Sequence, residues 1–245
     1  MSVFGRRRRK EEKLEENLEA TEQDASDEAG ETSPEHGPYD SSQAPDDDLL
    51  RLDLGGLKIP ALPNLKFGMP ADENGRLRQE VVISNEDSVL RVAVCAAPRN
   101  EGIWDEIREE IAQSVKERGG RSEFVEGAYG TELLAYQPDG RNKTTLVRYI
   151  GIDGPRWFLR ALFHGSRAET DEADSTLDVC LQGMIVERGN EAMPLREGLT
   201  LQLPEEMMAA RKKHVEEKAQ TARSSASGSG ATGGNTRRKP SPKPR

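Results

Sequence analysis

The side chains with the clearest chemical potential are three arginines, Arg148, Arg156 and Arg160, in the densest apolar segment of a polar chain. A guanidinium offers a planar fork of N–H donors that suits carboxylate and phosphate groups. If Arg148 and Arg160 share one face of a hairpin, they form a cationic spot on an acidic domain. The pattern then predicts a site for an anion or an acidic partner. The alternative is that these arginines form ion pairs with Asp and Glu of their own domain.

Residue types that commonly carry catalysis or bind metals are sparse in the sequence. The three histidines, His36, His164 and His214, have no partner at ligand spacing, so the sequence predicts no metal site. His164 is followed by Gly165 and Ser166, but adjacent residues of a strand point to opposite faces, and this order does not make a catalytic triad. The simpler interpretation of His164 is a partly buried residue at a strand end.

The glycines near residue 153 do not form a phosphate-binding loop. The segment Gly-Ile-Asp-Gly-Pro at 151–155 lacks the Lys-Ser/Thr of a P-loop and the strand–helix context of a dinucleotide site. No G-x-S-x-G motif occurs, and Asp153 is interpreted as a turn residue. The sequence therefore predicts no catalytic residue and no cofactor, and it favours a protein that is not an enzyme.

Composition and charge divide the chain into three parts. Of 245 residues, 34% are hydrophobic and 4% aromatic, so much of the chain lacks the apolar content for a core. Residues 11–48 contain fifteen acidic residues and one lysine, whereas residues 211–245 contain ten basic and two acidic residues. We expect a disordered acidic tail with a basic N-terminus at 1–48, one domain at 49–210 and a flexible basic tail at 211–245.

The same features bear on location and partners. No run approaches the roughly 18 apolar residues of a membrane span, and no apolar region follows the basic start as in a secretory signal. We therefore expect a cytoplasmic protein with no membrane partner. Cys95 and Cys180 lie in apolar surroundings, which favours two reduced core cysteines, with a disulfide between them as the alternative.

The arginines belong to a predicted central hairpin with strands at 146–150 and 157–163. Asp153-Gly154 between apolar runs is a turn signal, because glycine readily takes a positive φ. The side chains of the second strand then divide between two faces. One face carries Trp157, Leu159, Ala161 and Phe163, and the other carries Phe158 and Leu162 with Arg156 and Arg160.

A helix is predicted between Asn100, a good N-cap, and Gly119-Gly120. Its apolar stripe must cover one face of the sheet, and Trp104 with this stripe is predicted to contribute more to stability than any surface ion pair. The stripe consists of Ile103, Trp104, Ile107, Ile111 and Val115.

The remaining pattern predicts short strands joined by tight turns, and hence an antiparallel sheet. A second helix is predicted near 174–184, although Met184-Ile185-Val186 alternatively begins a strand. A last strand is predicted at 199–203 and a terminal helix at 205–218. The predicted fold class is α+β: a single domain, mostly antiparallel sheet packed by two helices, with disordered tails.

The segment Gly154-Pro155-Arg156-Trp157-Phe158-Leu159-Arg160 is the most distinctive in the chain. With the start Phe-Gly-Arg-Arg-Arg-Arg at 4–9 and the closing Leu-Pro-Glu at 203–205, it resembles an actinobacterial family catalogued as a domain of unknown function. The resemblance covers about residues 49–206. It implies a cytoplasmic bacterial protein and transfers no functional residue.

Three functional hypotheses follow. The first is a non-catalytic protein-interaction module, favoured by the lack of a catalytic constellation. The second is a weak nucleic-acid-associated protein acting through the basic tail, with strongly salt-dependent binding. The domain is acidic and lacks the broad basic surface of a duplex-binding domain, which counts against this second hypothesis. The third is an enzyme or small-anion binder near Arg148, Arg156 and Arg160.

Overall fold

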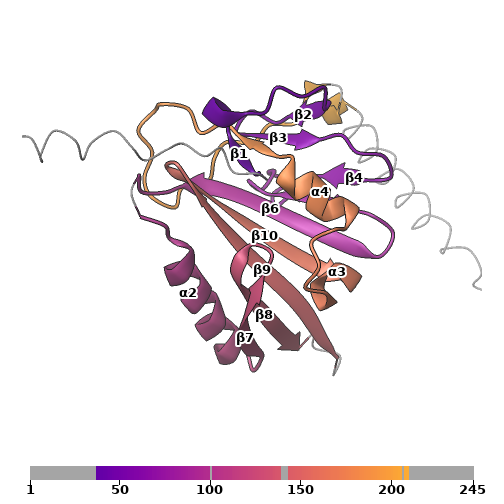
Figure 1. Cartoon of the computed structure of the whole chain (residues 1–245), viewed down its shortest axis with the longest axis vertical. Helices are drawn as coiled ribbons and strands as arrows, with labels where there is room; N and C mark the ends of the chain where they lie inside the picture. Colours follow the sequence, from indigo (N-terminus) through magenta and orange to yellow (C-terminus); the bar gives the residue numbers. More distant parts are fainter. Residues whose placement is uncertain (1–36, 100, 139–142, 206, 210–245) are drawn as a thin grey trace, which may run out of the picture.

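The computed structural model describes residues 37–99, 101–138, 143–205 and 207–209. Its main element is a seven-stranded sheet in which every neighbouring pair of strands is antiparallel. The predicted α+β class, with a mostly antiparallel sheet in a single domain, is confirmed. Across the sheet (Figure 1) the strands are β4 (Lys66–Gly68), β5 (Val81–Ser84), β6 (Ser88–Ala96), β10 (Trp157–Gly165), β9 (Thr144–Gly154), β8 (Gly130–Pro138) and β7 (Arg121–Gly127).

The central hairpin is formed by β9 and β10, and β6 pairs with the other edge of β10. The predicted hairpin is thus confirmed, but its loop is Pro155-Arg156, where Arg156 has a φ of 64°. The interpretation of Asp153 as a turn residue is wrong, because it lies in β9 opposite Phe158. Gly154 ends β9 beneath an indole ring, where a Cβ would lie 2.1 Å from a Trp157 ring carbon.

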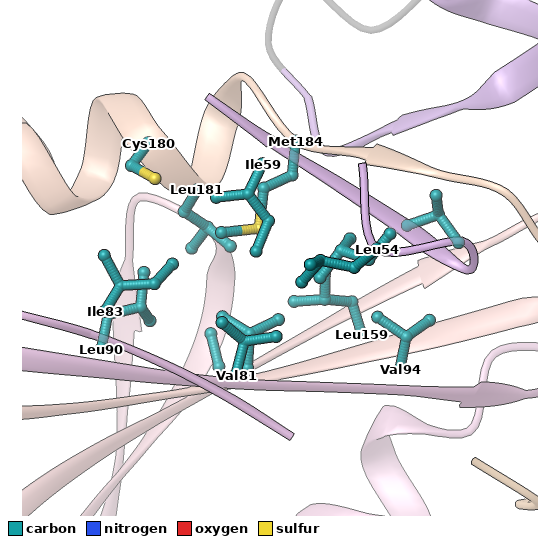
Figure 2. Close-up of a cluster of buried hydrophobic side chains, with 14 of the residues drawn as sticks. Leu54, Ile59, Val81, Ile83, Leu90, Val94, Leu159, Cys180, Leu181 and Met184 are labelled. Atoms are coloured by element: carbon teal, nitrogen blue, oxygen red, sulfur yellow. The ribbon is translucent and has the colours of Figure 1, made fainter. Parts of the chain in front are cut away.

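One face of the main sheet, which we call the inner face, is covered by a second sheet and by helix α4 (Thr176–Gln182) (Figure 1). Between these layers lies the large apolar core, and Figure 2 shows Val81 and Leu159 of the main sheet facing Ile59 and Met184. The predicted apolar face of β10 points into this core. The second sheet has the order β1 (Tyr39–Asp40), β11 (Ile185–Val186), β3 (Leu57–Pro60) and β2 (Arg51–Asp53).

Secondary structure is present before the predicted domain boundary at residue 49. Strand β1 and a 3-10 helix (Ser41–Gln43) lie in the segment that composition assigned to a tail. A tertiary contact explains this, since Asp40 accepts a 2.9 Å hydrogen bond from Nε1 of Trp157. The remaining parts of the predicted tails, residues 1–36 and 211–245, lie outside the described residues.

The end of the domain also differs from the prediction. Instead of a strand at 199–203, the chain makes isolated bridges, from Gly198 to Cys95 and from Leu201 to Gly55. The predicted second helix is α4, and the strand foreseen as its alternative follows it as β11. A further short helix, α3 (Ser166–Glu169), forms between β10 and α4, where the sequence predicted no helix. Of the predicted terminal helix, residues 205 and 207–209 are helical, and the rest lies outside the described residues.

The opposite face of the main sheet, the outer face, carries helix α2 (Trp104–Glu117), as the apolar stripe predicted. The indole of Trp104 stacks on Phe158 with ring centroids 6.0 Å apart. It also covers Gly151, where a Cβ would lie 2.2 Å from a ring carbon. Its Nε1 donates a 2.7 Å hydrogen bond to the carbonyl oxygen of Thr131, so both ends of the ring are fixed.

The N-terminus of α2 is capped from the sheet. The predicted cap, Asn100, lies outside the described residues, and the helix begins four positions later. The carboxylate of Asp153 accepts hydrogen bonds from the backbone N–H of Ile103 at 2.8 Å and of Trp104 at 3.3 Å. A carboxylate at a helix N-terminus satisfies free N–H groups and opposes the helix dipole. Asp153 therefore joins β9 to α2.

Two smaller points concern the cysteines and the helices. Cys95 on β6 and Cys180 on α4 are free thiols, so the two do not form a disulfide. In the described ranges, the helices are too short or too polar to span a bilayer.

Candidate functional site

The three candidate arginines lie apart. The β9–β10 loop has two residues, so Arg148 pairs with Phe163 and Arg160 pairs with Gly151. Opposed residues of antiparallel strands share a face, which places Arg148 on the inner face and Arg160 on the outer face. Arg148 and Arg160 would share a face only if the loop between the strands had an odd number of residues. A one-residue change of register turns the side chains of one strand to the opposite face of the sheet.

Arg148 is fully engaged within the domain. Its guanidinium donates to Glu132 and to Asp171, both at 2.7 Å, and to the carbonyl oxygen of Ala168 at 3.2 Å. Burial opposes ionisation, but the two carboxylates outweigh it and raise the pKa of Arg148. Arg148 and Glu132 are each 1% exposed. The contacts of Arg148 agree with the alternative interpretation, in which it forms ion pairs with Asp and Glu of its own domain.

Arg156 has a local structural role. It occupies the second position of the β9–β10 loop and donates to the carbonyl oxygen of Gly189 at 2.8 Å. A second, 3.3 Å contact reaches Oδ1 of Asn190. These bonds tie the hairpin loop to the segment after β11.

Arg160 differs from both. Its side chain is half-buried on the outer face, and its Nε is buried without a hydrogen-bond partner. Across the described residues, its guanidinium makes no hydrogen bond or ion pair. The Nε atoms of Arg108 and Arg188 are also buried without a partner, but other contacts of these two guanidinium groups are formed within the domain. A buried guanidinium nitrogen without a partner is costly, which makes Arg160 the candidate of interest among the three arginines.

Arg160 lines two adjoining cavities between α2 and the outer face, of about 340 Å³ and about 320 Å³. The two share Glu110, Ile111 and Arg160, and we call them together the α2 hollow. The first cavity is lined by further hydrogen-bonding side chains, Ser114, Arg118, Gln137 and Tyr149. The second is lined by Cys95, Phe158 and Arg196, among others.

The carboxylate that lines the hollow does not neutralise the positive charge of Arg160. Glu110, the one carboxylate among the residues lining the two cavities, accepts two bonds from Nη1 of Arg196, at 2.9 and 3.1 Å. Arg196 also contacts Glu106 at 2.7 Å. The engagement of Glu110 by Arg196 leaves Arg160 with donors and no acceptor.

The thiol and the imidazole near this region are in their neutral forms. Burial raises the pKa of Cys95, although Arg160 and Arg196 act in the opposite direction. Burial, and then the charge of Arg91, lowers the pKa of His164, which does not line the hollow. Since a thiolate is the nucleophilic form of cysteine, Cys95 is poorly suited to attack an electrophile at neutral pH.

Sequence reasoning found Arg160 but missed the residues around it. Ser114 on α2 and Arg118, the C-cap of this helix, lie four positions apart, beside the apolar residues Ile111 and Val115. Residues at that spacing share a helix face, so the edge of the apolar stripe was the available signal. Gln137 and Tyr149 join them only through the strand pairing of β8 and β9, and Gln137 donates to the Tyr149 hydroxyl at 3.1 Å.

The structure also bears on a metal site and on the nucleic-acid hypothesis. No cluster of three or more His, Cys, Asp or Glu side chains capable of holding a metal ion occurs in the ranges that the structure describes. The nucleic-acid hypothesis depends on residues 211–245, which lie outside those ranges, and it stays a prediction.

Comparison with known families concerns the whole described domain. Residues 37–210 match the model of a family described as a protein of unknown function (DUF3710). The chain belongs to this family. The resemblance to a domain-of-unknown-function family is thereby confirmed, whereas the actinobacterial origin and the role of the segment at 154–160 stay expectations. No curated protein and no solved structure matches the chain. The family brings no assigned residue roles, so the function must be argued from the site.

Proposed function

We propose that this protein is a non-catalytic binding module that holds a compact anionic group, phosphate or carboxylate, in the α2 hollow. The observation that carries the proposal is the guanidinium of Arg160, which has a buried and unpartnered Nε beside two cavities. An anion that accepts from this group supplies the missing partner and recovers the cost of its burial.

The lining of the hollow supports an anion over a neutral or cationic ligand. Arg118 adds a second guanidinium to the first cavity, and the hydroxyl groups of Ser114 and Tyr149 add neutral donors. Charged donors form shorter and stronger hydrogen bonds with ionised oxygens than with neutral ones. A cation would instead meet two arginines and a carboxylate that Arg196 already occupies.

The environment of the hollow favours binding over reaction. Cys95 is a neutral thiol, and His164 lies outside the lining. Apolar side chains, Ile111 and Leu162, line the first cavity beside the donors. Such a mixture suits an anionic group carried on a larger molecule, such as an acidic side chain or a phosphoryl group of a partner protein.

The test is thermal unfolding of the full chain with three probes: inorganic phosphate, succinate and a hexaglutamate peptide. A ligand at a hundredfold excess over Kd stabilises the folded state by about 2.7 kcal/mol. For a chain of this size that corresponds to a rise of roughly 5–10 °C in Tm. A response to phosphate alone, to both small anions, or only to the peptide separates the sources of the anion.

The matched variants are Arg160→Gln and Arg156→Gln. The first removes the proposed donor, and the second removes an arginine whose partners, Gly189 and Asn190, lie outside the hollow. We expect the first variant to lose the rise in Tm and the second to keep it. An equal rise in both variants, or no rise with any probe in the wild-type chain, overturns the proposal.

The rate at which Cys95 is alkylated is an independent measure of whether an anion occupies the α2 hollow. Cys95 lines the hollow, whereas Cys180 is completely buried, and burial raises its pKa to about 12. At alkaline pH, where part of the Cys95 thiol is ionised, iodoacetamide should therefore modify Cys95 and leave Cys180 as an internal reference. The bound anion should slow the modification of Cys95 in the wild-type chain and leave its rate unchanged in Arg160→Gln.

A further inference from the structure

The main sheet ends on one side at β7, and no strand lies beside its outer edge within the described part of the chain (Figure 1). β7 is 7 residues long and pairs with β8 in unbroken register over its whole length. An open edge presents unpaired backbone N–H and C=O groups to another chain. Natural proteins commonly block such an edge with proline, lysine or a bulge, and the Arg121–Gly127 strand has none of these.

The charged side chains of β7 do not block this edge, because their contacts run to β8. The guanidinium of Arg121 lies over the ring of Tyr136, 3.6 Å from its centroid. Glu123 accepts a 2.7 Å hydrogen bond from the Tyr136 hydroxyl, and Glu126 accepts a 2.9 Å bond from the Thr131 hydroxyl. All three charges are therefore held over the neighbouring strand.

The middle of the same strand carries an apolar side chain. Phe124 pairs with Leu133 and lies on the outer face, where the guanidinium of Arg108 from α2 stands 5.1 Å from its ring centroid. Even so, Phe124 is 44% exposed. A half-exposed aromatic at the centre of an open edge is surface that a partner strand can cover.

From these contacts we propose that two copies of this chain associate through β7, with the two strands antiparallel and fully overlapped about a two-fold axis at Phe124. Pairing of identical antiparallel strands is self-complementary, and two-fold dimers are the commonest homo-oligomers. Full overlap brings Phe124 opposite Phe124 of the second copy, an aromatic cross-strand pair. It also sets Ser122 opposite Glu126, where the hydroxyl donates to the carboxylate.

The charges of β7 favour this register over its neighbours. In full overlap Glu123 faces Val125 and Arg121 faces Gly127, so no like charges are directly opposed. A shift of two residues in one direction brings Glu123 opposite Glu123 of the second copy. The opposite shift places Phe124 against Glu126. Like charges in facing positions destabilise a strand pair, and the second shift loses the aromatic pair.

Sedimentation equilibrium of the full chain tests the association. We expect a wild-type mass of twice the 27.1 kDa chain, and the mass of one chain for Phe124→Asp, which sets two carboxylates opposite each other. Leu195→Asp is the control, because Leu195 is 63% exposed and lies outside β7, and it should remain a dimer. A monomeric wild-type chain, or a dimer that persists in Phe124→Asp, overturns the proposal.

Cysteine substitutions test the register of the two β7 strands without adding a charge to their interface. In a Cys95→Ser background, Phe124→Cys should form an intermolecular disulfide on mild oxidation, because the two-fold axis places residue 124 opposite itself. Ser122→Cys lies opposite Glu126 of the second copy and should crosslink much less. Faster crosslinking at 122 than at 124 contradicts the register. Phe124 does not line the α2 hollow, so failure of the proposed dimer leaves the proposed anion site unaffected.

Discussion

On the inner face of the main sheet, Arg148 is 1% exposed and bonded to Glu132, Asp171 and a backbone carbonyl. On the outer face of the same hairpin, Arg160 has a buried Nε with no partner among the described residues. The inner face lies beneath a second sheet and two helices, whereas one helix crosses the outer face (Figure 1). Where a face is buried, as at Arg148 and Glu132, a charge must be satisfied within the domain because water does not reach it.

Under the proposed function, this contrast makes the outer face the binding side. α2 contacts the sheet through Trp104, Ile107 and Ile111, and the α2 hollow opens beside this contact. Arg160 has no partner among the described residues, so the proposal assigns its guanidinium to the bound anion. The predictions below test this difference between the two faces by substitutions on each of them.

The largest effect is expected on the inner face, for Arg148→Met. Removing the guanidinium leaves the Glu132 carboxylate, which is 1% exposed, without its charged partner. Breaking one side of a buried ion pair costs about 3–5 kcal/mol of unfolding free energy. Urea denaturation measures the loss. Asp171→Asn is the control, since the Asp171 side chain is 75% exposed and its loss should cost about 1 kcal/mol or less.

An intermediate effect is expected for Asp153→Ala, which removes the cap of α2. The first N–H groups of the helix, at Ile103 and Trp104, lose their acceptor. Loss of an N-cap costs about 0.5–2 kcal/mol. Native-state hydrogen exchange should show faster exchange in α2 and little change in β10. Equal acceleration in both elements would mean that Asp153 acts on the whole domain rather than on the helix.

The smallest effect on stability is expected for Arg160→Met, the same substitution as at 148 but on the outer face. No carboxylate is left behind, because Glu110 keeps its bonds to Arg196. The free energy of unfolding should stay within about 0.5 kcal/mol of the wild type or rise. Urea denaturation beside Arg148→Met makes the comparison direct. A loss as large as that of Arg148→Met would assign Arg160 a structural role and contradict the contrast.

Much of the fold was predictable because its signals are local. The alternation along β10 assigned Trp157 and Leu159 to the core face, and the 3.6-residue period of α2 predicted a helix against the sheet. The candidate site was only partly predictable. Arg160 stood out by its type, but its lack of a partner depends on residues more than 30 positions away, such as Glu110 and Arg196.

The sequence by itself determined which residues face the same way along each strand and helix, since these periodicities follow from backbone geometry alone. The tertiary structure decided how the elements are placed against one another. The two-residue loop Pro155-Arg156 sent Arg148 and Arg160 to opposite faces, and the contact with Asp153 set where α2 begins. Register and capping depend on chain segments that meet only in the folded state, and for that reason local patterns do not encode them.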